Sequence, residues 1–438
     1  MARMTTEVAV TPERAVLADK DVRGLKYLRH LLPLFARLHE VGCERDKSAN
    51  RKLHFDQYCA LVMLYLFNPL IDSMRALQYA SGLPRAKKRG LDRFSLGSFS
   101  EAPGVFDPER LREIIGELAT EARPLAMNPR LSELKHALTL TDSTVLEALP
   151  RLARAACAET RLNTSRSGQE THAHRLHTQL DLKTFQPNRI ECTGASRRGD
   201  GAETAVLLRS LEPDRCYVGD GGYYDTRLFD GIVNIGSSFV MRVREDCVYT
   251  LIEEREITDI DRAAGIRRDL LVNLGTTPTQ RPVRLLIIEV PPHPRRTRKA
   301  NRPHGGSTEK AYIGSRVCDQ LMIATNLTDL PADLVGLIYR QRYSVELFFR
   351  FLKHLLGMRH LLSHRTKGVE IQTYCALIAC LLINLQTGRK PNKRMMETLG
   401  WYLLGLIDEQ AVVDELNKAD NTGVKLRAKE ALWKKMGA

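Results

Sequence analysis

The chain has 438 residues, of which 43% are hydrophobic, and its formal net charge is +14. This length and apolar content exclude an intrinsically disordered protein and allow two or three domains around a large buried core. The surplus of Lys and Arg over Asp and Glu, 66 against 52, favours a polyanionic partner such as nucleic acid, although a basic protein without that partner would have the same composition.

The cysteines and the apolar runs indicate in which cellular compartment the protein is found. The nine Cys are scattered without a CxxC pair, and the N-terminus does not resemble a signal peptide, so we expect free thiols in a reducing cytoplasm. No group of Cys or His has the spacing of a zinc site. The most apolar run starts at Tyr374 and is about a dozen residues long, whereas a membrane span needs about 20. We therefore expect a core helix there, and we do not expect the protein to have a membrane as a partner.

Residues 1–130 are expected to form a helical N-terminal domain. Apolar residues recur every three or four positions in residues 23–40 and 54–82, and Asp107-Pro108 is typical of a helix start. Between these helices, residues 84–93 hold five Lys or Arg. That connector is either a solvated turn or a contact to nucleic acid.

Residues 131–245 change in character and predict an α/β fold with a mixed sheet. Short β-rich runs and two helical runs follow one another in the order βββαβαβ. The expected strands are residues 138–145, 174–182, 188–195, 215–220 and 238–244, and the expected helices are residues 202–211 and 224–236.

Residues 246–328 are expected to form a β-rich insertion, because four further β-like runs delay the next helix. These runs are residues 246–254, 267–275, 282–290 and 319–327. Residues 291–306 hold five Lys or Arg and no acid, which predicts a loop that contacts DNA if DNA is the partner.

Helices are expected again after the insertion. Residues 329–390 resume the core fold, and residues 391–438 form a helical C-terminal segment. Leu and Val recur at helical spacing in residues 396–416, so this stretch either contacts a second chain or packs on the core.

The apolar parts of two strands are expected to finish on an aspartate that is followed by small residues. Asp142 follows the apolar run of the first strand, and Asp220 follows that of the fourth. Side chains at strand ends leave the sheet and become available to a ligand. A single Asp in such a place is weak evidence, because helix caps and turns also use Asp.

A third carboxylate lies on a charged stripe within residues 339–353. On a continuous helix, Tyr339, Arg342, Glu346 and Lys353 fall within an arc of about 60°. The apolar side chains fall on the opposite side and are expected to pack: Val345, Phe348, Phe351, Leu352 and Leu355.

The predicted topology brings the three carboxylates together. The first and fourth strands are expected to be neighbours at the centre of the sheet, with the helix of Glu346 beside them. Asp142, Asp220 and Glu346 would then repel one another and need a counter-charge. Two Mg²⁺ or Mn²⁺ ions roughly 4 Å apart would supply it and could promote phosphodiester displacement.

Tyr339-x2-Arg342-x3-Glu346-x6-Lys353 resembles the YREK signature of insertion-sequence transposases of the DDE type. TDST around Asp142 and VGDGGYYDTRLFD around Asp220 are similar to the two acidic motifs of that family, and the resemblance covers residues 138–386.

The resemblance implies an RNase H-like catalytic core, interrupted by a β-rich insertion before the last acidic residue. It also implies that Asp142, Asp220 and Glu346 hold two Mg²⁺ ions, with Mn²⁺ accepted in their place. Arg342 and Lys353 would contact the backbone of the transposon end, and Tyr339 a phosphate near the cleaved end.

The implied function is cut-and-paste transposition in the cytoplasm at the nucleoid. The protein would bind terminal inverted repeats through residues 1–130, cleave the double-stranded DNA at the ends and join the 3′-OH to target DNA. Excision needs both ends, which predicts a homodimer on DNA. Two alternatives remain open: a non-catalytic DNA-binding regulator derived from a transposase, and a stand-alone RNase H-like nuclease.

Overall fold

The computed structural model describes residues 33–41, 52–68, 71, 73–87, 90–121, 127–131, 134–147, 173–194, 202–244, 247–290, 320–355, 361–363, 365–387, 393–403, 406–408, 410–415 and 417–418. Some of the expectations above concern residues that lie outside these ranges. These residues include 1–32, the basic run 291–306 and 419–438.

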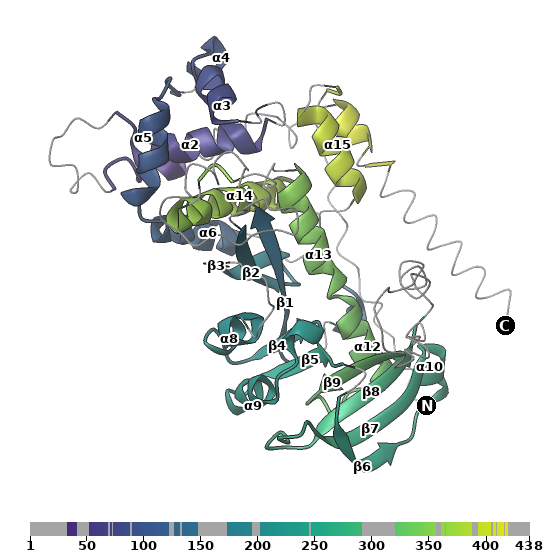
Figure 1. Ribbon diagram of the computed structural model, residues 1–438. Coiled ribbons are helices and arrows are strands. Elements are labelled where there is room, and N and C mark those ends of the chain that lie inside the picture. Colours follow the sequence, from purple (N-terminus) through teal and green to yellow (C-terminus); the bar gives the residue numbers. More distant parts are fainter. Residues whose placement is uncertain are drawn as a thin grey trace, which may run out of the picture.

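One mixed sheet runs through the described part of the chain (Figure 1). Its nine strands have the order β3-β2-β1-β4-β5-β9-β8-β7-β6. The first five strands in the chain and the two helices between them follow the predicted order βββαβαβ. They are β1 (Ala137–Glu147), β2 (Ala173–Asp181), β3 (Gln186–Gly194), α8 (Ala202–Leu208), β4 (Arg215–Gly219), α9 (Thr226–Asn234) and β5 (Ser238–Arg242).

The predicted contact between the first and fourth strands is confirmed. Strand β1 pairs with β4 in parallel and with β2 in antiparallel orientation, and β5 lies parallel to β4 on its other side. The buried faces of these strands are rich in Leu, Val, Phe and Tyr, which suits the central position of the strands.

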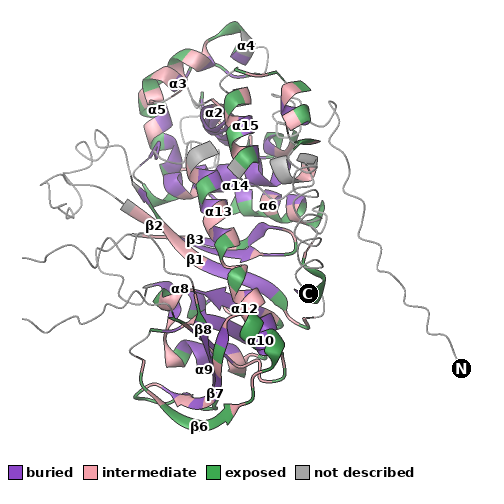
Figure 2. Cartoon of the chain, turned by 90° about the vertical axis from the view of Figure 1, so that its right-hand side faces the viewer, coloured by how far each residue is buried: buried purple, intermediate pink, exposed green. Residues whose placement is uncertain are grey.

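The four expected strands of the insertion are also present, and they extend the same sheet. They are β6 (Tyr249–Arg255), β7 (Ile266–Leu274), β8 (Val283–Glu289) and β9 (Gln320–Thr325). Strand β9 pairs with β5, with Val240 opposite Thr325, so the ladder passes from the core into the insertion without a break. At the far edge, most residues of β6 are exposed (Figure 2).

The helices of the N-terminal region share one hydrophobic core with later helices. Their bounds are α2 (Phe55–Leu66), α3 (Met74–Ser81), α4 (Pro84–Lys87), α5 (Leu96–Glu101) and α6 (Glu109–Glu121), and α14 (Thr366–Thr387) packs on α2 and α6. Asp107 starts α6 as predicted, because its Oδ1 accepts a hydrogen bond from the N–H of Glu109.

The apolar run from Tyr374 lies inside α14 and is buried from Tyr374 to Leu382, which confirms the expected core helix. No described helix is both long and apolar enough to cross a membrane. The division into domains stays a prediction.

The expected single helix of residues 339–353 is divided, which corrects the sequence analysis. Helix α12 (Ala332–Arg340) ends before α13 (Tyr343–Arg350), and the π-helical turn η6 (Phe351–Leu355) follows. Gln341 and Arg342 donate their N–H groups to carbonyls three residues back, so the chain tightens at this point and keeps its direction.

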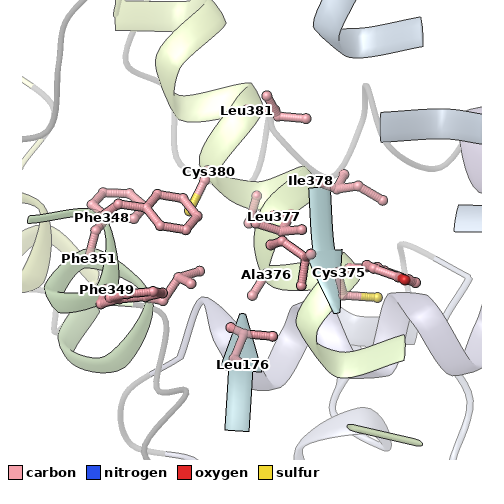
Figure 3. Packing of buried hydrophobic residues seen from close by; sticks show 14 of the residues in the cluster. Leu176, Phe348, Phe349, Phe351, Cys375, Ala376, Leu377, Ile378, Cys380 and Leu381 are labelled. Carbon is pink, nitrogen blue, oxygen red and sulfur yellow. The ribbon is translucent and has the colours of Figure 1, made fainter. Parts of the chain in front are cut away.

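The packing face predicted for this stretch is confirmed where its side chains are described. Val345, Phe348, Phe351 and Leu352 are each at most 1% exposed. Figure 3 shows Phe348 beside Cys380 of α14. Burying an aromatic side chain of this size contributes about 1.5–3 kcal/mol, so this face fixes α13 against the core.

The C-terminal stretch divides into buried and exposed side chains. Leu399 of α15 (Lys393–Leu403) and the later residues Val412 and Val413 are buried in the main core. Trp401 and Leu406 are 46% and 70% exposed. The buried residues favour packing on the core, while the exposed ones remain available to a second chain.

Candidate active site

Asp142 lies within β1 and not at its end, which corrects the sequence analysis. The parallel pairs with β4 stop at Leu140 and Val218, whereas β1 continues beside β2 as far as Glu147. Asp142 therefore lies two residues beyond the part of β1 that pairs with β4. The side chain is 19% exposed.

Asp220 follows the last residue of β4, as predicted. Its carboxylate accepts a hydrogen bond from the N–H of Gly222 at 2.9 Å and caps the 3₁₀ turn η5 (Gly221–Tyr223). Gly219 is the tightly packed glycine of this motif. A Cβ there would lie 2.7 Å from the sulfur of Met241 and 2.8 Å from Oγ1 of Thr141.

Glu346 reaches the site from the first turn of α13 and is paired with Arg342. Nη2 of Arg342 donates to Oε1 of Glu346 at 2.6 Å. Nη1 of the same guanidinium lies 3.8 Å from Oδ2 of Asp142. Arg342 thus connects a carboxylate of the sheet with one of the helix.

The carboxylates of Asp220 and Glu346 act electrostatically on Asp142. Burial, together with the smaller effects of the charges of Asp220 and Glu346, raises the pKa of Asp142 to about 6. The N–H of Ser143 and the guanidinium of Arg342 oppose this shift by stabilising the ionised form. The structure therefore brings Asp142 and Glu346 to one guanidinium and places Asp220 within electrostatic reach of Asp142, and the role of the three as one site stays a prediction.

Tyr339 lies at the end of α12, close to the same charges. Burial raises the pKa of its phenol, Arg342 and Arg242 lower it, and Asp220 raises it. Lys353 lies in η6 and contacts β1 three residues beyond Asp142, where its Nζ donates to the carbonyl oxygen of Val145 at 2.9 Å. This contact joins η6 to β1 near Asp142.

Arg242 is a member of this group that the sequence analysis missed. It ends β5, and the pairing of Gly219 with Met241 places it beside Asp220. Its influence on Tyr339 shows that it faces the same region. The signal in the sequence was a third strand with a charged residue at its carboxyl end.

The donor set fits a hard divalent cation. Among the described side chains, no three of Asp, Glu, His or Cys already surround a point where a metal ion could be held. Asp142 and Glu346 nevertheless share the positive charge of Arg342, and Asp220 lies within electrostatic reach. Neighbouring carboxylates repel one another and need a positive charge between them, and carboxylate oxygens are the ligands that Mg²⁺ and Mn²⁺ prefer.

Residues 133–382 match the protein family described as "Transposase DDE domain". This span covers more than half of the chain and includes all three carboxylates. The chain belongs to the DDE transposase family. Members of this family normally use divalent metals, in agreement with the carboxylate donors of the site.

The chain is also similar to a curated protein. The chain is 22% identical over 231 residues to the protein named "Putative transposase y4zB" of Sinorhizobium fredii (strain NBRC 101917 / NGR234). The match covers 50% of this chain and 55% of that protein, so the chain spans about half the length of this curated relative.

A similarity to a solved structure was also found. The cryo-EM structure of the piggyBac transposase synaptic complex with hairpin DNA has a TM-score of 0.39 and 10% sequence identity, over 92% of this chain and 82% of that chain.

Proposed function

We propose that the chain is an insertion-sequence transposase of the YREK type that binds terminal inverted repeats, cleaves the DNA at the transposon ends and joins the 3′-OH to target DNA. The observation that carries this proposal is the arrangement of Asp142 and Glu346 around one guanidinium, with Asp220 within electrostatic reach, inside a transposase DDE domain. The order and pairing of β1 to β5 support an RNase H-like core.

Asp142, Asp220 and Glu346 would hold two Mg²⁺ ions, and Mn²⁺ should be accepted. When bound, such ions lower the pKa of an attacking oxygen and stabilise the charge on a leaving oxygen. In each displacement, an oxygen of water or of the 3′-OH forms a bond to phosphorus and loses its proton, while the bond from phosphorus to the departing oxygen breaks.

The residues of the chain prepare the site for this chemistry. The N–H of Ser143 holds one oxygen of Asp142, and the N–H of Gly222 holds one oxygen of Asp220, which orients both carboxylates. Arg342 is half-buried beside the carboxylates, so a DNA phosphate brought to the site would meet its guanidinium.

Tyr339 and Lys353 are the other candidate contacts of the DNA end. Tyr339 presents its phenol next to Arg342. Lys353 holds η6 on β1 at a place where its ammonium could also meet a phosphate. Residues 1–130 would recognise the inverted repeats, because base readout generally uses a helix in the major groove.

A cleavage assay tests the proposed function. The substrate is DNA that carries the inverted repeats flanking the coding region, incubated with Mg²⁺ and the full chain. Asp142→Asn, Asp220→Asn and Glu346→Gln should each abolish strand cleavage and leave DNA affinity largely unchanged, because these charges position metal ions and do not bind the DNA backbone.

Asp259→Asn is the matched control, since the Asp259 side chain is 100% exposed on α10 (Asp259–Ala263) and lies in the insertion. It should cleave like the unmodified chain. Near-normal cleavage by two of the three active-site variants would refute the assignment.

A further inference from the structure

A second charged group lies behind Asp142, on the other face of the sheet. Ser143 follows Asp142 along β1, and successive side chains of a strand point to opposite faces. The carboxylate of Asp142 faces Arg342, whereas the hydroxyl of Ser143 faces α8 and contacts Glu203. Figure 1 shows α8 and α13 on opposite sides of β1.

Ser143, Glu203 and Arg175 contact one another pairwise. Oγ of Ser143 donates to Oε1 of Glu203 at 3.1 Å, and Nη1 of Arg175 donates to Oγ of Ser143 at 3.2 Å. The same Nη1 donates to Oε1 of Glu203. The side chains of Arg175 and Glu203 are only 20% and 11% exposed. Their positions depend on one another, because a buried charge without its partner is costly.

Ser143 connects this group to the carboxylate on the other face. Its N–H donates to Oδ1 of Asp142 at 2.7 Å. The hydroxyl of Ser143 is therefore held from one side of the sheet while its peptide group holds Asp142 on the other. Oδ2 of Asp142 is left facing Arg342.

The restraint acts where β1 loses one of its neighbours. Parallel pairing with β4 stops at Leu140, and the described ladder continues past Asp142 only on the β2 side. Arg175 comes from β2 and Glu203 from α8, so together they hold this part of β1 from behind. A carboxylate that binds a metal ion needs such support, since small errors in its position weaken the site.

We propose that Glu203 and Arg175 are positioning residues for Asp142, which act through Ser143 to orient the carboxylate toward a divalent cation. This inference rests on the proposed function, in which Asp142 is a metal ligand. If the ion pair only stabilised the packing of α8 on the sheet, its loss would lower the stability of the fold and leave the metal affinity unchanged.

Mn²⁺ binding to the full chain, measured by isothermal titration calorimetry, tests this role without an activity assay. Ser143→Ala removes the hydroxyl and keeps the peptide N–H, and Glu203→Gln removes the charge at similar size. We expect each to weaken Mn²⁺ binding by about tenfold or more, as the loss of a group behind a metal ligand generally does. Ser143→Thr keeps a hydroxyl and should restore most of the affinity.

The double variant shows whether Glu203 acts through Ser143. If it does, Glu203→Gln should weaken Mn²⁺ binding no further in the Ser143→Ala background. Glu191→Gln is the matched control, because Glu191 pairs with Arg209 just after α8 on the same side of the sheet. This control should bind Mn²⁺ like the unmodified chain. If Glu203→Gln does not fold, the comparison of Ser143→Ala with Ser143→Thr still decides the question.

The outcomes separate this inference from the proposed function. Unmodified Mn²⁺ affinity in Ser143→Ala and Glu203→Gln, with loss of binding in Asp142→Asn, would overturn the positioning role alone. Additive losses in the double variant would show that Glu203 does not act through Ser143. Unchanged Mn²⁺ affinity in Asp142→Asn would instead overturn the proposed function.

Discussion

Arg342 and Glu346 form an ion pair that joins the helix of the site to the sheet. Nη2 of Arg342 lies 2.6 Å from Oε1 of Glu346, and the same guanidinium reaches toward Asp142. An exposed pair four residues apart on a helix contributes only about 0.3–0.5 kcal/mol. Here the Arg342 side chain is 21% exposed and lies between carboxylates of two elements. The arrangement reduces their repulsion, which an isolated surface pair would not do.

Asp142 should destabilise the fold at neutral pH. Burial, with added repulsion from Asp220 and Glu346, raises its pKa from 3.8 to about 6. The folded chain then binds the proton of Asp142 more tightly than the unfolded chain does. The stabilisation that this proton gives to the fold is therefore fully present below about pH 4 and is lost as the pH rises through about 6. Asp142→Asn should therefore raise the free energy of unfolding by on the order of 2 kcal/mol at pH 7.5, and by little at pH 4.

Urea unfolding with EDTA at both pH values measures this difference. Asp259→Asn is the control, because its carboxylate is fully exposed, and it should change the free energy of unfolding little at either pH. A gain of the same size at pH 4 and pH 7.5 would contradict a raised pKa of Asp142.

Gly219 should not tolerate a side chain. A Cβ at this position would lie 2.7 Å from the sulfur of Met241, 2.8 Å from Oγ1 of Thr141 and 3.0 Å from the ring of Tyr223. Gly219→Ala should therefore lower the free energy of unfolding by about 1–3 kcal/mol and displace the neighbouring Asp220. Gly221→Ala is the control, because its Cβ would meet nothing within 4 Å. Equal stability of the two variants in thermal unfolding would disprove the close packing.

The buried pair of Asp269 and Arg284 should link the insertion to the helix of Tyr339. The two side chains are 4% and 2% exposed, and Nη1 of Arg284 also donates to the carbonyl oxygens of Leu327 and Leu330, just before α12. Asp269→Asn should lower the free energy of unfolding by about 3–5 kcal/mol, because it leaves a buried cation without its partner.

The control for this prediction is an exposed ion pair that also involves β7. Glu254 pairs with Arg268 on the exposed edge, with 48% and 42% of the side chains accessible. Glu254→Gln should cost less than about 1 kcal/mol. If both variants were equally stable in urea, the pair would not link the insertion to α12.

The sequence was most informative where the signal is local. Apolar alternation predicted the strands, and the order βββαβαβ was enough to place the strand of Asp142 next to the strand that precedes Asp220, because few sheet topologies are compatible with that order. The stripe of Glu346 and the buried face of Phe348 also follow from residues that are close in sequence.

Strand register and partners from distant segments could not be predicted in this way. Arg242 lies beside Asp220 only because Gly219 pairs with Met241, and that pairing depends on contacts across the sheet. The contact of Arg175 with Glu203 likewise joins β2 and α8, which the sequence does not mark as neighbours. The continuation of β1 beyond Asp142 depends on its pairing with β2.

Transposition should require two chains, because excision cuts two ends and each chain supplies one set of Asp142, Asp220 and Glu346. A symmetric dimer is the commonest way to provide two such sites. We expect pairing mainly on DNA, since the net charge of +14 opposes the association of two free chains. In the test, unmodified chains and Glu346→Gln chains carry different tags and are mixed in equal amounts with DNA that carries the two transposon ends. Complexes that contain one chain of each kind and both DNA ends are then purified through the two tags. These mixed complexes should cut one end and leave the other intact, whereas complexes that mix unmodified and Asp259→Asn chains should cut both. Cleavage of both ends by a complex with one active chain would refute the two-chain mechanism.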